Sequence, residues 1–70
     1  MPNNYLRPTE LLELEGVSLI FQDPREIGQV FSIFNRYDKK ILKGYRTRDG
    51  VRIDKQSFID FIRIIKQMPN

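Results

Sequence analysis

The sequence predicts a single small α+β domain (1–70) with about three helices and one β-hairpin, and three observations lead to this prediction. The dipeptide Asp49-Gly50 lies between two runs of alternating character, which is a strong short-range hairpin signal. Two apolar stripes with helical spacing follow Pro24 and Asp54, and both begin at residues that favour a helix start. A chain of 70 residues suits one such domain, which buries only about 60% of its unfolded surface.

The first seven residues (1–7) are expected to form a short extended arm. Arg7 precedes Pro8, and a residue before proline disfavours the helical conformation. Tyr5 and Leu6 within this arm can add an edge strand or pack on the core. The arm would therefore join the domain without a helix of its own.

A first helix is predicted from Pro8 and Thr9, with Thr9 as its N-cap and Gly16 at its end. The next five residues, 17–21, include four apolar members. Their length and β-branching suit a short strand, and a buried helical turn fits equally well. Both alternatives stay open for this segment.

A second helix is predicted after Asp23, which can act as its N-cap. Pro24 suits the first helical position, and Glu26 falls at the third, as in a capping box. The apolar stripe that follows has helical spacing and ends near Lys39-Lys40, where cations suit the C-terminal dipole. Gly28 lies inside this helix and costs about 1 kcal/mol relative to alanine.

The hairpin is expected over 42–54, followed by a last helix over 55–67 that Asp54 caps. A three-residue loop, Arg48-Asp49-Gly50, gives the hairpin one apolar face, with Gly50 left-handed in a bulge. In this register the core face carries Tyr45, Thr47, Val51 and Ile53, whereas Arg46 and Arg52 point to solvent and Arg48 lies at the tip.

The net charge of +3 is unevenly distributed along the chain. Residues 1–35 carry a charge of −3 and residues 36–70 a charge of +6, and eight of the ten bases in the second half lie between positions 36 and 55. A charge-segregated domain usually presents one face to a polyanion. The alternative is a solvated basic surface without a partner.

An enzyme or a metal protein is not expected. The chain has no histidine and no cysteine, and its glycines do not form a phosphate-binding loop, so neither a catalytic site nor a cofactor is predicted. A calcium loop counted from Asp38 would place Lys40 and Leu42 at ligand positions that need oxygen. The five phenylalanines have helical spacing and are expected in the core rather than as stacking platforms for nucleic acid.

The three hairpin arginines carry the functional prediction. Arginine presents a planar fork that matches phosphate, and a basic hairpin tip can enter or straddle a minor groove. The alternative is that Arg52 pairs with a nearby carboxylate, while Arg46 and Arg48 are merely solvated.

The order of basic strand, turn, Arg52-Ile53-Asp54-Lys55, and then Phe58 and Phe61 resembles the wing and last helix of small winged-helix proteins. The closest pattern is that of the phage and transposon excisionase family, which is related to MerR-like DNA-binding domains. Residues 5–12 and 16–18 look like the opening strand, first helix and turn of that family. The resemblance implies a winged helix-turn-helix fold with the hairpin as its wing, although an apolar run at 19–21 stands where the family places a polar recognition helix.

If the helix from position 24 to 39 acts as the recognition helix, its polar side chains could read bases. Glutamine and asparagine can read adenine edges, and arginine can read guanine. Ser32 is a further polar position on this helix. The candidate DNA-binding residues are Arg46, Arg48, Arg52, Lys43, Arg36, Lys39, Lys40, Arg25, Gln29 and Asn35.

The expected function is binding of duplex DNA, as an excisionase (a recombination directionality factor) or as a small phage or plasmid transcriptional regulator. An integrase, another recombinase or a different protein could be a second partner. The alternative is a protein-interaction module without nucleic-acid binding, such as a phage-encoded inhibitor or a metal-free EF-hand-like adaptor. A cytoplasmic protein is expected, because no apolar run approaches the length of a membrane span. It is expected to be a monomer, or a weak dimer if residues 19–21 form an exposed apolar surface.

Overall fold

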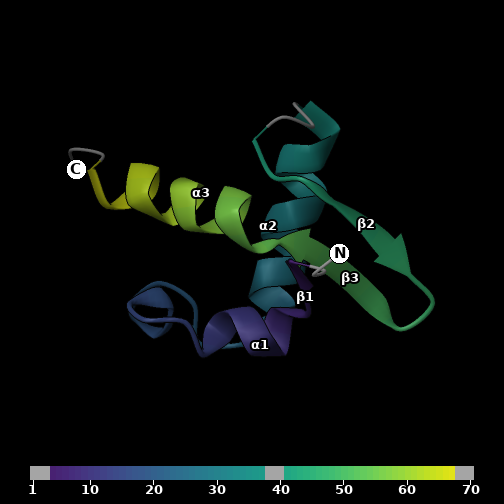
Figure 1. Ribbon diagram of the computed structural model, residues 1–70, viewed down its shortest axis with the longest axis horizontal. Helices are drawn as coiled ribbons and strands as arrows, with labels where there is room; N and C mark the ends of the chain where they lie inside the picture. Colours follow the sequence, from purple (N-terminus) through teal and green to yellow (C-terminus); the bar gives the residue numbers. More distant parts are fainter. Residues whose placement is uncertain (1–3, 38–40, 68–70) are drawn as a thin grey trace.

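The computed structural model describes residues 4–37 and 41–67 and contains three α-helices and a three-stranded antiparallel sheet (Figure 1). The strand order is β1-β3-β2, so β3 is the central strand. The α+β class, with a β-hairpin and three helices, is thereby confirmed. The elements in chain order are β1 (Tyr5–Leu6), α1 (Pro8–Leu12), the 3-10 helix η1 (Val17–Leu19), α2 (Pro24–Tyr37), β2 (Gly44–Thr47), β3 (Gly50–Asp54) and α3 (Lys55–Gln67).

Two helices begin as the sequence predicts, because acidic side chains satisfy their first backbone N–H groups. At α2, the carboxylate of Asp23 accepts a hydrogen bond from the backbone N–H of Arg25 at 2.9 Å, and that of Glu26 accepts one from Asp23 N at 2.9 Å. At α3, Asp54 Oδ2 accepts the N–H of Ser57 at 2.9 Å. The helix α2 ends at Tyr37; the predicted end at 39–40 lies outside the described residues.

The first helix differs from the prediction at both ends. Arg7, not Thr9, is its N-cap residue, because Pro8 takes the first helical position and Glu10 accepts the backbone N–H of Arg7 at 2.9 Å. The helix ends at Leu12, one turn before Gly16. Gly16 has φ +83° and is the N-cap of η1, so the first three residues of the apolar run, Val17–Leu19, form a helical turn and not a strand.

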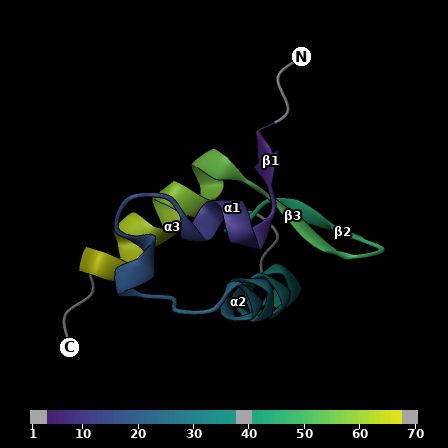
Figure 2. The ribbon, with the colours of Figure 1, turned by 90° about the horizontal axis from the view of Figure 1, so that it is seen from below.

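The core lies between the helices and one face of the sheet. The phenylalanines belong to it as predicted: four are buried, and the partly buried Phe34 meets Phe61 edge-on at 5.0 Å between ring centroids. Figure 2 shows α2 end-on beneath α1 and α3, with the hairpin extending away from the helices. The buried apolar residues are Leu11, Val17, Phe21, Ile27, Phe31, Leu42, Val51, Ile53, Phe58, Phe61 and Ile62.

The hairpin is shifted by one residue from the predicted register. Arg46 pairs with Val51 and Tyr45 pairs with Arg52, so the turn is the two-residue segment Arg48-Asp49. Because a one-residue shift exchanges the faces of a strand, Arg46 lies on the core-facing side. The predictions that Tyr45 and Thr47 face the core and that Arg46 points away are therefore wrong.

The turn explains this register. Arg48 and Asp49 both keep negative φ, and Gly50 adopts positive φ (147°), where glycine has no steric penalty. Gly50 pairs with Thr47 as the first residue of β3, so the prediction of a bulge at Gly50 is wrong. The hydroxyl of Thr47 donates a hydrogen bond to Asp49 Oδ1 at 2.8 Å and closes the turn. On the outer face, the ring of Tyr45 packs on the ring of Tyr5, so Tyr45 makes an aromatic contact outside the core.

Candidate nucleic-acid interface

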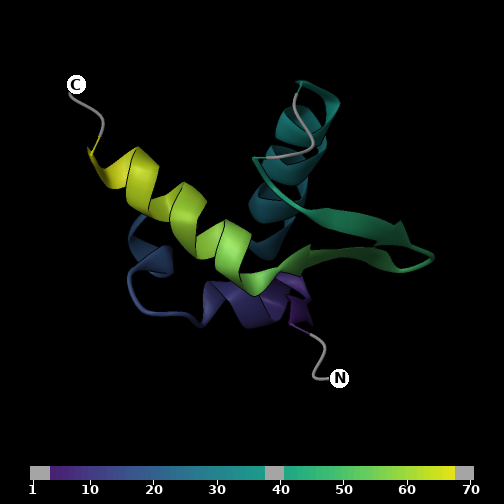
Figure 3. The same cartoon turned by 45° about the horizontal axis from the view of Figure 1, so that its top comes forward.

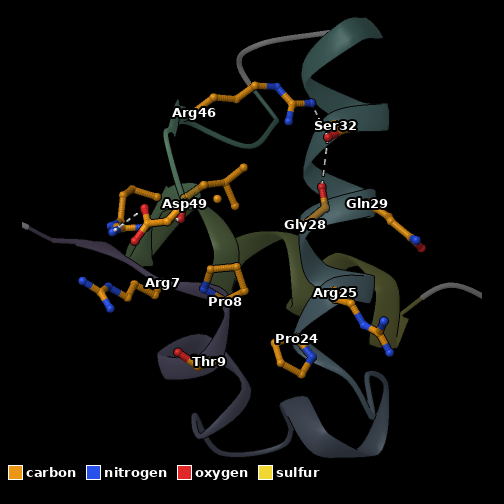
Figure 4. Close-up of a pocket in the computed structure, with 13 residues that line it drawn as sticks. Arg7, Pro8, Thr9, Pro24, Arg25, Gly28, Gln29, Ser32, Arg46 and Asp49 are labelled. Atoms are coloured by element: carbon orange, nitrogen blue, oxygen red, sulfur yellow. Dashed lines mark hydrogen bonds and ion pairs between the residues drawn. The ribbon is translucent and has the colours of Figure 1, made fainter.

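A groove of about 650 Å³ lies between the N-terminal half of α2, the start of α1 and the hairpin (Figure 4). It is formed by three segments that are far apart in the sequence and that the sheet and the core bring together. The groove is lined by Arg7, Pro8, Thr9, Pro24, Arg25, Gly28, Gln29, Ser32, Arg46, Asp49, Gly50, Val51 and Arg52.

The lining of the groove is strongly basic. Four arginines and the carboxylate of Asp49 line it, and two of these arginines are ion-paired: Arg25 with Asp23 at 2.9 Å and Arg52 with Asp49 at 3.5 Å. A concave surface with one dominant sign of charge concentrates the electrostatic potential and attracts ions of the opposite sign. Guanidinium groups also match the geometry of phosphate oxygens, so this groove suits a phosphate-rich ligand.

The exposed face of α2 continues this surface. Arg25, Gln29, Ser32 and Arg36 are spaced by four, three and four residues, which places them along one side of the helix. The Arg25 side chain is 86% exposed, and Figure 4 shows Arg25 and Gln29 extending from α2 on the side away from the hairpin. Asn35 is half-buried beside this row. The row therefore offers donors and acceptors to a ligand that lies along the helix.

Arg46 spans the groove from the hairpin to α2. Its guanidinium donates a hydrogen bond to the hydroxyl of Ser32, which in turn donates one to the carbonyl of Gly28 at 3.1 Å (Figure 4). The register places Arg46 on the helix-facing side of the hairpin, which is why it can make this contact. The guanidinium remains exposed, so it is both oriented and accessible.

Arg52 has a different environment. Its guanidinium lies 3.5 Å from Asp49 Oδ1 and donates to the carbonyl of Val51 at 3.0 Å, and its side chain is only 17% exposed. Arg52, in β3, therefore pairs with the carboxylate of Asp49 in the turn, as the alternative interpretation of the sequence expected. A hydrogen bond from the Thr47 hydroxyl, one from its own backbone N–H and the charge of Arg52 together hold the pKa of Asp49 below its ordinary value of 3.8.

The other predicted residues are not gathered in the groove. Arg48 is exposed in the turn, Arg36 is exposed in the last turn of α2, and Lys43 lines a second hollow of about 300 Å³ beside α3. Lys39 and Lys40 lie outside the described residues.

The sequence reasoning missed Arg7, which lines the groove from the start of α1. The signal that could have found it is Pro8, because proline imposes an extended backbone on Arg7 and fixes it next to the helix start.

Among the residues that the structure describes, no group of histidine, cysteine or acidic side chains could hold a metal ion. Within the same described parts of the chain, no helix has the length and apolar character to cross a membrane. No known protein family, curated protein or solved structure matches the chain, so the assignment of its function depends on these residues alone.

Proposed function

We propose that the protein binds duplex DNA as a winged helix-turn-helix domain, with α2 as the recognition helix and the β2–β3 hairpin as the wing. One observation carries this proposal: Arg7, Arg25, Arg46 and Arg52, from three separate parts of the chain, surround one groove beside an exposed helix face. Contacts of arginine with phosphates would position the domain on the duplex.

The helix α2 has the dimensions and chemistry for base recognition. A major groove about 12 Å wide admits one α-helix. Gln29 can form a bidentate contact with adenine, and Arg25 and Arg36 can do so with guanine. In this arrangement Arg46, on the adjoining hairpin, would contact the DNA phosphates that flank the major groove.

The biological role that fits this surface is that of an excisionase, which biases a recombinase, or of a small transcriptional regulator. Both need a compact domain that binds duplex DNA without catalysing a reaction. A recombinase would then be the protein partner in the first case.

A protein-interaction module is the second candidate function, and the exposed apolar side chains favour it. Ile41 and Ile64 border the second hollow and are 37% and 56% exposed. Affinity capture from a nuclease-treated lysate separates the two functions. A single protein retained without nucleic acid, by a chain that does not bind duplex DNA, would support this candidate.

The test of the first proposal is fluorescence anisotropy with a labelled duplex over a range of salt concentrations. We expect a plot of the logarithm of the binding constant against the logarithm of salt concentration to have a slope of about −2 to −4. The lower limit corresponds to phosphate contacts by Arg7 and Arg46 alone, and the upper limit to contacts by all four arginines after Arg25 and Arg52 leave Asp23 and Asp49. The double variant Arg25→Gln/Arg46→Gln should bind the duplex at least about tenfold more weakly, and its affinity should depend less steeply on salt concentration.

The matched control is Lys55→Gln/Arg63→Gln, which removes two charges from α3 outside the groove. This control should change the affinity by less than about twofold, because neither residue lines the groove. Equal losses in the two double variants, or no duplex binding at low salt, would contradict the proposal. Circular dichroism confirms that both variants are folded.

A further inference from the structure

The outer face of the sheet carries a pair of tyrosines that the duplex-binding surface does not use. The helices pack on the opposite face, where Gly44 lies against Phe31 and where Ile53 is buried. On the outer face, Tyr5 pairs in register with Asp54 and Tyr45 with Arg52, so both tyrosine rings lie over the central strand. We call Tyr5 and Tyr45 the tyrosine face.

The two rings support each other and remain accessible. Their centroids are 5.3 Å apart with an interplanar angle of 52°, and Tyr5 is 36% and Tyr45 46% exposed. Each ring therefore contacts the other ring and also has part of its surface exposed to solvent. Side chains held in this way lose little further conformational freedom when a planar ligand stacks on them.

Basic side chains border the tyrosine face. Arg52 lies directly opposite Tyr45 in the register, and its guanidinium contacts Asp49, which it would have to exchange for a phosphate. Arg7 follows β1 directly, two residues after Tyr5, with an extended backbone (φ −76°, ψ 154°), and it also lines the groove together with Arg52. The carboxylate of Asp54 on this face is occupied by the N–H of Ser57, which it caps. An aromatic pair bordered by cations favours an anionic ligand with planar groups over an apolar peptide.

We propose that the tyrosine face binds single-stranded nucleic acid, with unpaired bases stacked on Tyr45 and Tyr5 and the phosphates between them held by Arg7 and Arg52. Base stacking on aromatic side chains, combined with cations along the backbone, is the general means of binding single strands without sequence readout. This binding goes beyond the recognition of a duplex by α2, and the two sites share Arg7 and Arg52 at their border but differ in the tyrosines, Arg25 and Arg46. A protein with both surfaces could bind where duplex and unpaired strand meet.

The test measures the affinity of the protein for a labelled oligothymidylate and for a duplex. Tyr45→Ala should weaken oligothymidylate binding about fivefold or more, whereas Tyr45→Phe, which keeps the ring, should bind like the wild type. Tyr37→Ala is the matched control, because Tyr37 is 82% exposed on α2 and lies outside the tyrosine face. Duplex affinity should change little in all three variants.

A second readout does not depend on the Tyr45→Ala variant being folded. In Tyr37→Phe protein, the remaining emission comes from Tyr5 and Tyr45, and stacking with thymine should quench it on titration. No binding of oligothymidylate, no quenching, or an equal loss with Tyr37→Ala would overturn the proposal. The Arg25→Gln/Arg46→Gln variant separates the two functions, because it should weaken duplex binding about tenfold and leave oligothymidylate binding unchanged.

Discussion

The guanidinium of Arg46 donates a hydrogen bond to the hydroxyl of Ser32 and thereby joins the hairpin to α2. The same hydroxyl donates to the carbonyl of Gly28, so its orientation is fixed from the helix side. Figure 3 shows the hairpin projecting to one side while the C-terminal end of α3 lies on the other. This contact therefore fixes the angle between the proposed wing and the proposed recognition helix.

Removal of the Ser32 hydroxyl should weaken duplex binding through Arg46. In Ser32→Ala the guanidinium loses its acceptor, and we expect affinity to fall about two- to fivefold. This corresponds to about 0.4–1 kcal/mol, at the low end for a hydrogen bond because the contact is exposed to water. Anisotropy titrations against Ser32→Thr, which keeps a hydroxyl, provide the control. Equal affinity of the alanine and threonine variants would show that Ser32 does not position Arg46.

The pKa of Asp49 should report on the hydrogen bond that Thr47 donates to it in the turn. Because its folded pKa lies below the ordinary value of 3.8, the stabilisation it provides is present above that pH and is lost as pH falls through the folded pKa. Thr47→Val removes the first cause of the shift and should move the pKa upward. An NMR titration of the carboxylate carbon measures both values, and an unchanged pKa in Thr47→Val would exclude the Thr47 hydrogen bond in solution.

Loss of the α3 cap should destabilise the whole domain. Asp54→Ala leaves the N–H of Ser57 without its acceptor at the start of a helix that carries much of the core, and we expect a loss of about 1 kcal/mol in the free energy of unfolding. Urea denaturation measures it. Asp60→Ala is the control on the same helix: this carboxylate is exposed and 4.0 Å from Arg63, so its removal should cost less than about 0.5 kcal/mol.

Two glycines should respond in opposite ways to alanine. A Cβ at Gly44 would lie 2.4 Å from the carbonyl oxygen of Arg52 and 2.8 Å from the ring of Phe31, so Gly44→Ala should destabilise the fold by about 1–3 kcal/mol. A Cβ at Gly28 would meet nothing within 4 Å, so Gly28→Ala should stabilise α2 by about 0.5–1 kcal/mol. Thermal unfolding measures both, and a stable Gly44→Ala variant would contradict the packing of β2 on α2.

The sequence was informative where a local rule decides the structure. Asp23 and Asp54 cap their helices as predicted, because a cap depends on residues three positions apart. Gly50 has positive φ at the predicted position. The apolar spacing of α2 and α3 predicted which phenylalanines enter the core.

Tertiary packing decided the rest. The prediction chose the hairpin register that buried Tyr45, whereas the structure gives Tyr45 a partner in Tyr5, forty residues earlier in the chain, and places Arg46 against α2. Neither contact can be predicted from a local sequence pattern, because each joins residues that are far apart in the chain. The groove was missed for the same reason, since Arg7 joins it only when β1 pairs with β3.

The central claim is that α2 and the hairpin contact duplex DNA together. NMR chemical-shift mapping tests it most directly, by titrating a short duplex into isotopically labelled protein at low salt. The account predicts that the largest shifts fall on Arg25, Gln29, Ser32 and Arg46, and that α3 beyond Phe58 changes little. Shifts concentrated on α3 and on the hollow around Ile64, or no shifts at all, would contradict it.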